Sequence, residues 1–175
     1  VTFRHWPTLE KDIKIALAAA GAFGEKHLDG LKNIDGVEVV SVVGRRLEPT
    51  QQVAAKYGIR HATTELAEAL AQPGLDAVIL CTPTQMHAAQ AIQCMEAGKH
   101  VQVEIPLCDS LADGEAVLAK AEETGLTCMA GHTRRFNPSH QYLHGRIAAG
   151  ELAVQQMDVQ TYFFRRKNMN VKGQA

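Results

Sequence analysis

The chain has 175 residues, 46% of them apolar, and a formal net charge of −1 at pH 7. That length suffices for one packed domain and the beginning of a second. The balanced charge gives no electrostatic footprint for nucleic acid or an anionic membrane, and no apolar run reaches the ~20 residues that span a bilayer. The four cysteines form no Cys-x-x-Cys pair, which favours reduced thiols and a cytoplasmic location. We therefore expect neither nucleic acid nor membrane as a partner.

Apolar runs rich in β-branched residues alternate with segments of helical periodicity over most of the chain. In chain order the pattern predicts a strand at 13–19, helix at 22–34, strand at 37–43, helices at 48–57 and 66–70, strand at 76–81, helix at 85–97, strand at 99–104, helix at 110–124 with Ser110 as N-cap, and strand at 126–131. Strands separated by helices indicate βαβ units. The expected fold class is α/β, a Rossmann-type doubly wound parallel sheet.

The pattern changes after Gly131. Asn137 and Pro138 suit an N-cap and the first position of a helix, and the alternating residues 154–164 predict a strand. A lone strand is not stable without partners, so we expect the chain to hold only the first helix and strand of an incomplete α+β domain. The predicted organisation is an unassigned segment at 1–12, a dinucleotide-binding domain at 13–136, and the start of a truncated substrate and dimerisation domain at 137–175.

The turn after the first predicted strand is rich in glycine. Residues 19–24 read Ala-Ala-Gly-Ala-Phe-Gly, where a dinucleotide-binding fingerprint has G-x-G-x-x-G. We predict that Gly21, Ala22, Phe23 and Gly24 bind the pyrophosphate at a helix N-terminus. Ala19 occupies the first glycine position and costs roughly 1–2 kcal/mol if that position needs a positive φ. Any tight turn between a strand and a helix has a similar composition, so this motif alone leaves the function open.

Two arginines follow the second predicted strand. NAD-binding enzymes place Asp or Glu there to accept from the ribose hydroxyls, whereas NADP-binding enzymes place Arg near the 2′-phosphate. After this strand the chain has Arg45 and Arg46, and the first acidic residue that follows them is Glu48. The pattern favours NADP, with NAD possible; the alternative is two solvated arginines on a loop.

Two further motifs carry a family resemblance. Residues 81–87 read Cys-Thr-Pro-Thr-Gln-Met-His, and residues 97–106 read Ala-Gly-Lys-His-Val-Gln-Val-Glu-Ile-Pro. Together they resemble the glucose–fructose oxidoreductase / inositol dehydrogenase family, which carries a Thr-Pro…His turn and Ala-Gly-Lys-His-Val…Glu-Lys-Pro. The resemblance implies a Rossmann cofactor domain and a second domain, an open antiparallel sheet that pairs subunits, and hence a homodimeric full-length parent.

The resemblance also implies cofactor contacts in these motifs, from Thr82, Pro83, Thr84, His87, Glu104 and Ile105. His87 has a structural alternative, a hydrogen bond to a neighbouring loop. The remaining histidines considered show no spacing suited to a metal, and no metal is predicted; they are His27, His61, His100, His140 and His144.

Residues 131–138 match the turn that follows the last strand of the family's cofactor domain. We predict that His132, Arg134 and Arg135 face the substrate, because adjacent guanidiniums suit a carboxylate. For Arg135 an equal alternative is a structural contact to the helix that follows. The run Arg165–Lys167 is interpreted as a solvated strand end, and Arg165 and Arg166 as a possible second carboxylate site.

Ile105 replaces the family's lysine, which touches the reacting oxygen of the substrate. The motifs at residues 21–27, 103–107 and 131–140 are similar to one subgroup that shares this isoleucine. That resemblance implies NADP-dependent oxidation of the hemiacetal of 4-carboxy-2-hydroxymuconate-6-semialdehyde to 2-pyrone-4,6-dicarboxylate in aromatic-acid catabolism. No catalytic base is assigned, and the isolated chain is expected to be inactive. The alternatives are a non-catalytic dinucleotide-binding fragment or sensor, and a methyltransferase. The Glu104-Ile105-Pro106 motif and the Arg45-Arg46 pair argue against the methyltransferase.

Overall fold

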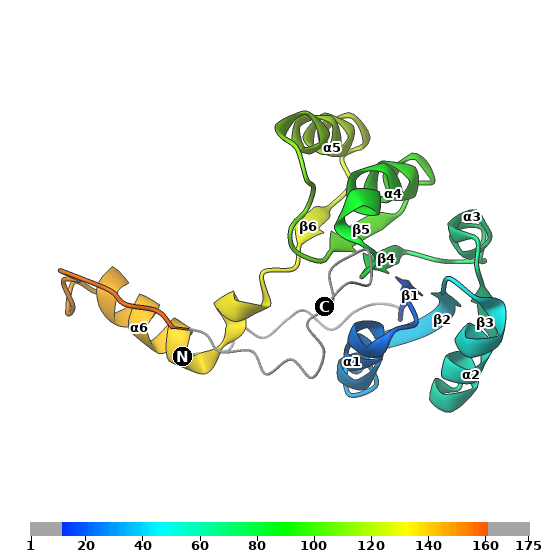
Figure 1. The fold of residues 1–175 in the computed structure, drawn as a ribbon, viewed down its shortest axis with the longest axis horizontal. Helices are drawn as coiled ribbons and strands as arrows, with labels where there is room; N and C mark the ends of the chain where they lie inside the picture. Colours follow the sequence, from blue (N-terminus) through cyan, green and yellow to red (C-terminus); the bar gives the residue numbers. More distant parts are fainter. Residues whose placement is uncertain (1–11, 161–175) are drawn as a thin grey trace, which may run out of the picture. The chain divides into compact units, whose positions relative to one another are not determined.

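A computed structural model describes residues 12–160 of the chain (Figure 1). These residues form two compact units, and the division falls between His132 and Thr133. No helix within residues 12–160 is long and apolar enough to cross a membrane.

The first unit is built on a parallel sheet of six strands in the order β3-β2-β1-β4-β5-β6. The strands are β1 (Ile13–Ala18), β2 (Val37–Val43), β3 (His61–Thr63), β4 (Ala77–Leu80), β5 (His100–Val103) and β6 (Cys128–Ala130). The strand order reverses at β1, which pairs with β2 on one side and with β4 on the other. The predicted doubly wound Rossmann sheet is therefore confirmed, and its switch point lies between β1 and β4.

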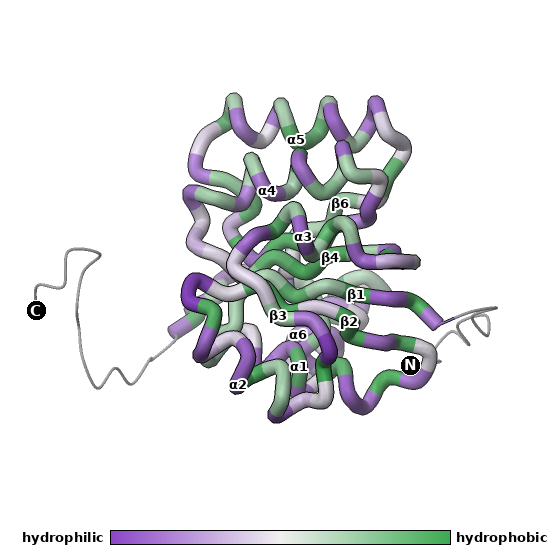
Figure 2. The backbone as a smooth tube through the Cα atoms, turned by 90° about the vertical axis from the view of Figure 1, so that its right-hand side faces the viewer, coloured by the Kyte–Doolittle hydropathy of each residue, from purple (hydrophilic) through white to green (hydrophobic). Residues whose placement is uncertain are grey.

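Helices cover both faces of this sheet (Figure 1). They are α1 (Ala22–Leu31), α2 (Leu47–Tyr57), α3 (Leu66–Leu70), α4 (Thr84–Glu96) and α5 (Leu111–Thr124). Alternate residues of β1 serve the two faces: Ile15 and Leu17 pack in one apolar core with α1 and α2, whereas Ala16 and Ala18 pack in the other with α3, α4 and α5. Figure 2 shows hydrophobic colouring along β4, as expected for a strand that is buried on both faces.

The element boundaries follow local backbone chemistry. Gly58 and Gly125 adopt left-handed conformations at the C-caps of α2 and α5, where each predicted helix was expected to end. Ser110 is the N-cap of α5, and its hydroxyl accepts a hydrogen bond from the amide of Asp113, so that prediction is confirmed. Helix α1 ends at Leu31, three residues before the predicted end, because residues 32–34 form hydrogen-bonded turns instead.

Strand β3 was not predicted from the sequence. It has only three residues, too few for a periodic signal, and it exists because it pairs with the end of β2. The Ser41 hydroxyl and Nδ1 of His61 lie 2.9 Å apart across this pair.

The second unit contains a 3₁₀ helix, η1 (Thr133–Phe136), and helix α6 (Pro138–Ala148). The Asn137 side chain caps α6 by accepting a hydrogen bond from the amide of Ser139 (3.0 Å), as the sequence predicts. The strand predicted at 154–164 is wrong for its described part, because residues 154–160 form no strand. A strand requires a hydrogen-bonded neighbour, and the described residues of this unit supply none. Residues 161–164, Arg165 and Arg166 lie outside the described residues.

Candidate functional site

The glycine-rich turn joins β1 to α1 at the carboxyl edge of the sheet. Gly21 is the N-cap of α1, and no side chain caps this helix end. A Cβ atom added to Gly21 meets nothing within 4 Å, so there is open space beside the first helical amides. A Cβ on Gly24 would lie 1.8 Å from the carbonyl oxygen of Ala19, so only glycine allows the helix to approach the strand this closely. Uncapped amides with open space beside the N-cap glycine suit an anionic ligand.

Ala19 has a φ of 119°, in the region that favours glycine. The first position of the fingerprint thus keeps the backbone conformation of a glycine although it carries a methyl group. The positive φ that was the condition for a cost of roughly 1–2 kcal/mol is therefore met at Ala19.

The negative charge of Glu25, beside the glycine-rich turn, is neutralised by a lysine of the same unit. The only acidic side chain in the first turn of α1, Glu25, forms an ion pair with Lys56 of α2. The hydroxyl of Tyr57 lies 3.4 Å from the Glu25 carbonyl oxygen. The lysine offsets the negative charge that a pyrophosphate would otherwise meet at this helix end.

Arg45 and Arg46 follow β2, and both side chains are exposed. Their loop is held in shape by Thr50, whose hydroxyl donates a 2.6 Å hydrogen bond to the Arg46 carbonyl oxygen. Gly44 packs directly on this threonine, because a Cβ on Gly44 would lie 2.0 Å from the Thr50 hydroxyl oxygen. The loop backbone is therefore fixed by a buried contact, while the two guanidiniums stay in solvent.

The Thr82-Pro83-Thr84 turn joins β4 to α4, and the side chain of His87 contacts the backbone of this turn. The His87 side chain is buried, and its Nδ1 and Nε2 lie 2.8 Å and 2.7 Å from the carbonyl oxygens of Pro106 and Thr82. His87 thus ties two loops of the carboxyl edge together, and its ring has no face open to a ligand. Pro83 is the N-cap of α4 and Thr84 its first residue, while the Thr82 hydroxyl donates to Gln90 (2.6 Å).

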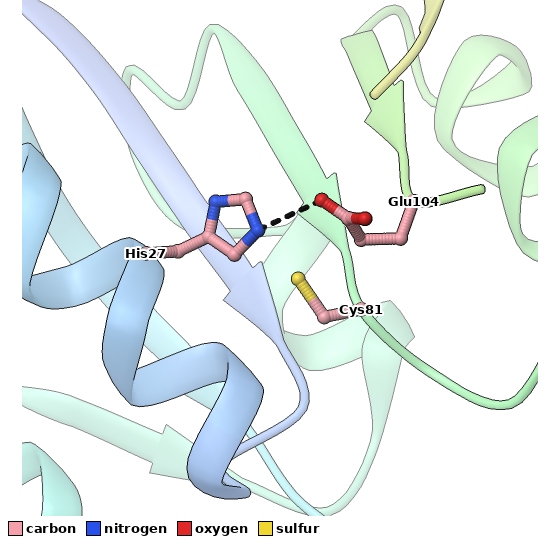
Figure 3. Close-up of side chains that lie close together, drawn as sticks. All are labelled: His27, Cys81 and Glu104. Carbon is pink, nitrogen blue, oxygen red and sulfur yellow. Dashed lines mark hydrogen bonds and ion pairs between the residues drawn. The ribbon is translucent and has the colours of Figure 1, made fainter. Parts of the chain in front are cut away.

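Three side chains from different elements meet at the same edge (Figure 3). Nε2 of His27, on α1, lies 2.9 Å from Oε1 of Glu104, which follows β5. The thiol of Cys81, which follows β4, points toward this pair, and one donor atom from each of the three residues lies within 4.8 Å of the other two. Burial, and to a lesser extent the charge of Glu104, raises the pKa of the Cys81 thiol to about 12.

Ile105 follows Glu104, and its side chain is 47% exposed. An isoleucine at this position can neither donate nor accept a proton, whereas the lysine that stands here in the resembling family carries an ammonium group.

The predicted substrate residues divide between the two units. His132 is exposed at the end of the first unit. Arg134 and Arg135 lie on η1 of the second unit and are exposed, and the Arg134 carbonyl oxygen accepts from the amide of Asn137 (3.1 Å). The predicted cofactor residues therefore lie at the carboxyl edge of the sheet in the first unit. Arg134 and Arg135 belong to the second unit.

Sequence reasoning missed His27 and Cys81. Spacing along the chain does not reveal these residues, because they come together only when the sheet forms. A usable signal was present: Cys81 and Glu104 each directly follow a strand, and His27 lies one turn after Gly24. Because β1, β4 and β5 are neighbours, residues at their carboxyl ends share one edge.

Comparisons with known families agree with this architecture. The GFO/IDH/MocA family, described as an oxidoreductase family with an NAD-binding Rossmann fold, matches residues 13–132. A family described as bacterial oxidoreductases, C-terminal, matches residues 138–175.

Individual relatives include two curated dehydrogenases. The chain is 74% identical, over 93% of its length and 51% of the relative, to 4-carboxy-2-hydroxymuconate-6-semialdehyde dehydrogenase of Sphingobium sp. (strain NBRC 103272 / SYK-6). It is 36% identical, over 82% of its length and 42% of the relative, to scyllo-inositol 2-dehydrogenase (NAD(+)) of Bacillus subtilis (strain 168). The chain thus spans about half the length of the curated relatives it matches.

A solved structure is similar over the same region. The WlbA dehydrogenase from Bordetella pertussis, in complex with NADH and UDP-GlcNAcA, matches with a TM-score of 0.76 and 28% identity, over 82% of this chain and 42% of that one. With the Rossmann sheet, the glycine-rich turn at the switch point and a family match over residues 13–132, the chain belongs to the GFO/IDH/MocA oxidoreductase family.

Proposed function

We propose that the protein is an NADP-dependent dehydrogenase, or the cofactor-binding half of one, that oxidises the hemiacetal of 4-carboxy-2-hydroxymuconate-6-semialdehyde to 2-pyrone-4,6-dicarboxylate. The observation that carries the proposal is the 74% identity to the Sphingobium dehydrogenase of that semialdehyde, which extends over 93% of this chain. Two features of the site support it independently: the arginine pair after β2 and the apolar Ile105.

The residues present fit a phosphorylated dinucleotide. Gly21 leaves open space at the uncapped N-terminus of α1, where helix amides would meet the pyrophosphate. Arg45 and Arg46 extend into solvent from a fixed loop, where they would pair with the 2′-phosphate of NADP. When bound, the nicotinamide supplies the acceptor for a hydride.

Ile105 supports the proposed substrate. Oxidation of an alcohol transfers a hydride to the cofactor and releases the hydroxyl proton, and a plain sugar alcohol benefits from a group that takes this proton. Ile105 has no such group. A hemiacetal hydroxyl is more acidic than a plain alcohol and loses hydride more readily, so it suits this site better than a polyol. His132, Arg134 and Arg135 are the residues that we propose for the substrate carboxylates.

Calorimetric titration of the chain with NADP and with NAD tests the cofactor. We expect NADP to bind more tightly, because NAD lacks the phosphate that the arginines would contact. Equal affinities for the two cofactors would contradict the proposal.

The substrate requires a second experiment. NADPH formation is followed with the semialdehyde, inositol and glucose, in this chain alone and in a chimaera that joins it to the C-terminal half of the Sphingobium relative. We expect turnover of the semialdehyde by the chimaera and little by the chain alone, because the family's substrate residues and base come largely from the second domain. Turnover of the polyols without the semialdehyde would overturn the substrate and leave the cofactor standing.

A non-catalytic dinucleotide-binding protein is the second candidate. It is favoured by Ala19, which carries a methyl group in a glycine-type backbone conformation directly beside the pyrophosphate turn. A chimaera that binds NADP but turns over none of the three substrates would support this alternative.

A further inference from the structure

The cluster of His27, Cys81 and Glu104 has the donor atoms of a metal site. It offers an imidazole nitrogen, a sulfur and a carboxylate oxygen, all within 4.8 Å of one another. In a tetrahedral Zn²⁺ site, bonds of about 2.0–2.3 Å place donor atoms roughly 3.3–3.8 Å apart. The His27–Glu104 separation is 2.9 Å, so a cation entering between them would lengthen it by about half an ångström.

The three donors are already held in place by the fold. Glu104 and Cys81 directly follow neighbouring parallel strands, β5 and β4. His27 projects from α1, and its ring contacts Phe23 edge to face, with ring centroids 5.5 Å apart. Figure 3 shows the imidazole directed at the carboxylate and the thiol directed at both. Little ordering of side chains would therefore be needed on binding.

The electrostatic balance also suits a dication. The His27 and Glu104 side chains are 17% and 11% exposed, so both are largely removed from water. Within the described residues, His27 is the hydrogen-bond partner of the Glu104 carboxylate. A carboxylate and a thiolate together neutralise a divalent cation, with the imidazole as a neutral third ligand and solvent as a fourth. The thiol proton passes to solvent when the metal binds.

We propose that His27, Cys81 and Glu104 bind a thiophilic divalent cation of the Zn²⁺ class. Sulfur with nitrogen selects such cations over Mg²⁺ and Ca²⁺, which prefer oxygen ligands. Because Glu104 is also one of the proposed cofactor contacts, a bound cation and the dinucleotide would compete. The cation site itself does not depend on the proposed dehydrogenase function, because its test uses the chain without cofactor.

The test is titration of the reduced, metal-free full chain with Co²⁺, a spectroscopic substitute for Zn²⁺. We expect one Co²⁺ per chain, a sulfur-to-cobalt charge-transfer band in the near ultraviolet, and loss of the band when Zn²⁺ is added. This spectrum is recorded on the native chain, so it does not depend on any variant being folded. Absence of the charge-transfer band overturns the proposal.

Variants then assign the ligands. Cys81→Ser should abolish the charge-transfer band, and His27→Gln and Glu104→Gln should each weaken Co²⁺ binding by at least about tenfold, since even the loss of an outer-sphere partner costs 10–100-fold. Cys108→Ser and His144→Gln are matched controls outside the cluster and should leave the titration unchanged. A band that persists in Cys81→Ser, or equal losses in the controls, contradicts the site.

The outcomes separate the two proposals. A chain that binds Co²⁺ through Cys81 but, in a separate titration in chelator-treated buffer, does not bind NADP contradicts the proposed function alone. A chain that binds NADP in chelator-treated buffer but gives no cobalt–thiolate band contradicts the metal site alone.

Discussion

A Cβ atom on Gly24 would lie 1.8 Å from the carbonyl oxygen of Ala19, five residues earlier in the same turn. This contact sets how closely α1 approaches the end of β1, and therefore where the helix amides stand. In the same turn, Ala19 has a φ of 119°, a backbone conformation that favours glycine. The first and last positions of the fingerprint therefore both favour glycine, but the chain has glycine only at the last position, Gly24, and alanine at the first.

Gly24→Ala should lower the free energy of unfolding by about 1–3 kcal/mol, because the new methyl group overlaps a backbone oxygen and α1 must move away from β1. Gly30→Ala is the matched control in the same helix, where an added Cβ meets nothing within 4 Å. It should raise the free energy of unfolding by about 0.5–1 kcal/mol. Urea unfolding of both variants provides the comparison, and a shift in the same direction for both would contradict this account.

Ala19→Gly should raise the free energy of unfolding by about 1 kcal/mol. Removing the methyl group relieves backbone strain of about 1–3 kcal/mol, and part of that gain is offset by the greater freedom of glycine in the unfolded chain. The variant should also bind both NADP and NAD more tightly. Ala20→Gly, at the neighbouring residue without a positive φ, should only destabilise. If Ala19→Gly changes neither stability nor affinity, the methyl group is accommodated.

Arg45→Ala and Arg46→Ala should each weaken NADP binding by about 1.5–3 kcal/mol and leave NAD binding unchanged, because only NADP carries the 2′-phosphate. Calorimetry at low and at moderate salt measures both effects, and the NADP preference should shrink as salt screens the exposed guanidiniums. Arg60→Ala is the control, since Arg60 is also exposed and pairs with Glu38 at 3.2 Å. Equal weakening of NADP and NAD would show that the arginines support the loop and do not recognise the phosphate.

The sheet was predictable because its central strands are buried on both faces. The apolar runs of β1 and β2 and the glycine caps after α2 and α5 leave clear local signals. Strand β3 left none, because three residues have no periodicity and the strand depends on pairing with β2. The strand expected at 154–164 failed over residues 154–160 for the complementary reason, since alternation indicates a strand only where a partner exists.

The parts of the candidate site that lie within one short segment of sequence were predictable. The parts in which the fold brings distant residues together were not. The glycine-rich turn, Arg45 and Arg46 could be identified from short motifs. His27, Cys81 and Glu104 come together although His27 and Glu104 are 77 residues apart in the sequence. Their proximity depends on the strand order β1-β4-β5. The burial of His87 between two carbonyl oxygens likewise depends on a distant segment, because one of these oxygens belongs to Pro106 in the loop after β5. The sequence of α4 around His87 gives no sign of that contact.

We expect Cys94 to make the free energy of unfolding depend on pH in the alkaline range. Its side chain is fully buried on α4, and burial raises the pKa of the thiol from 9.0 to about 12. Between these values the unfolded chain loses the thiol proton while the folded chain keeps it, so the free energy of unfolding falls as pH rises through this window. From pH 8 to pH 10 the free energy of unfolding should fall by about 1.4 kcal/mol because of this thiol.

Urea unfolding under reducing conditions measures this effect. Between pH 8 and pH 10, the free energy of unfolding of Cys94→Ala should fall by about 1.4 kcal/mol less than that of the native chain. Met95→Leu, a substitution at the neighbouring buried but non-titrating residue, should change stability equally at both pH values. If Cys94→Ala keeps the full pH dependence of the native chain, the buried thiol is not its source.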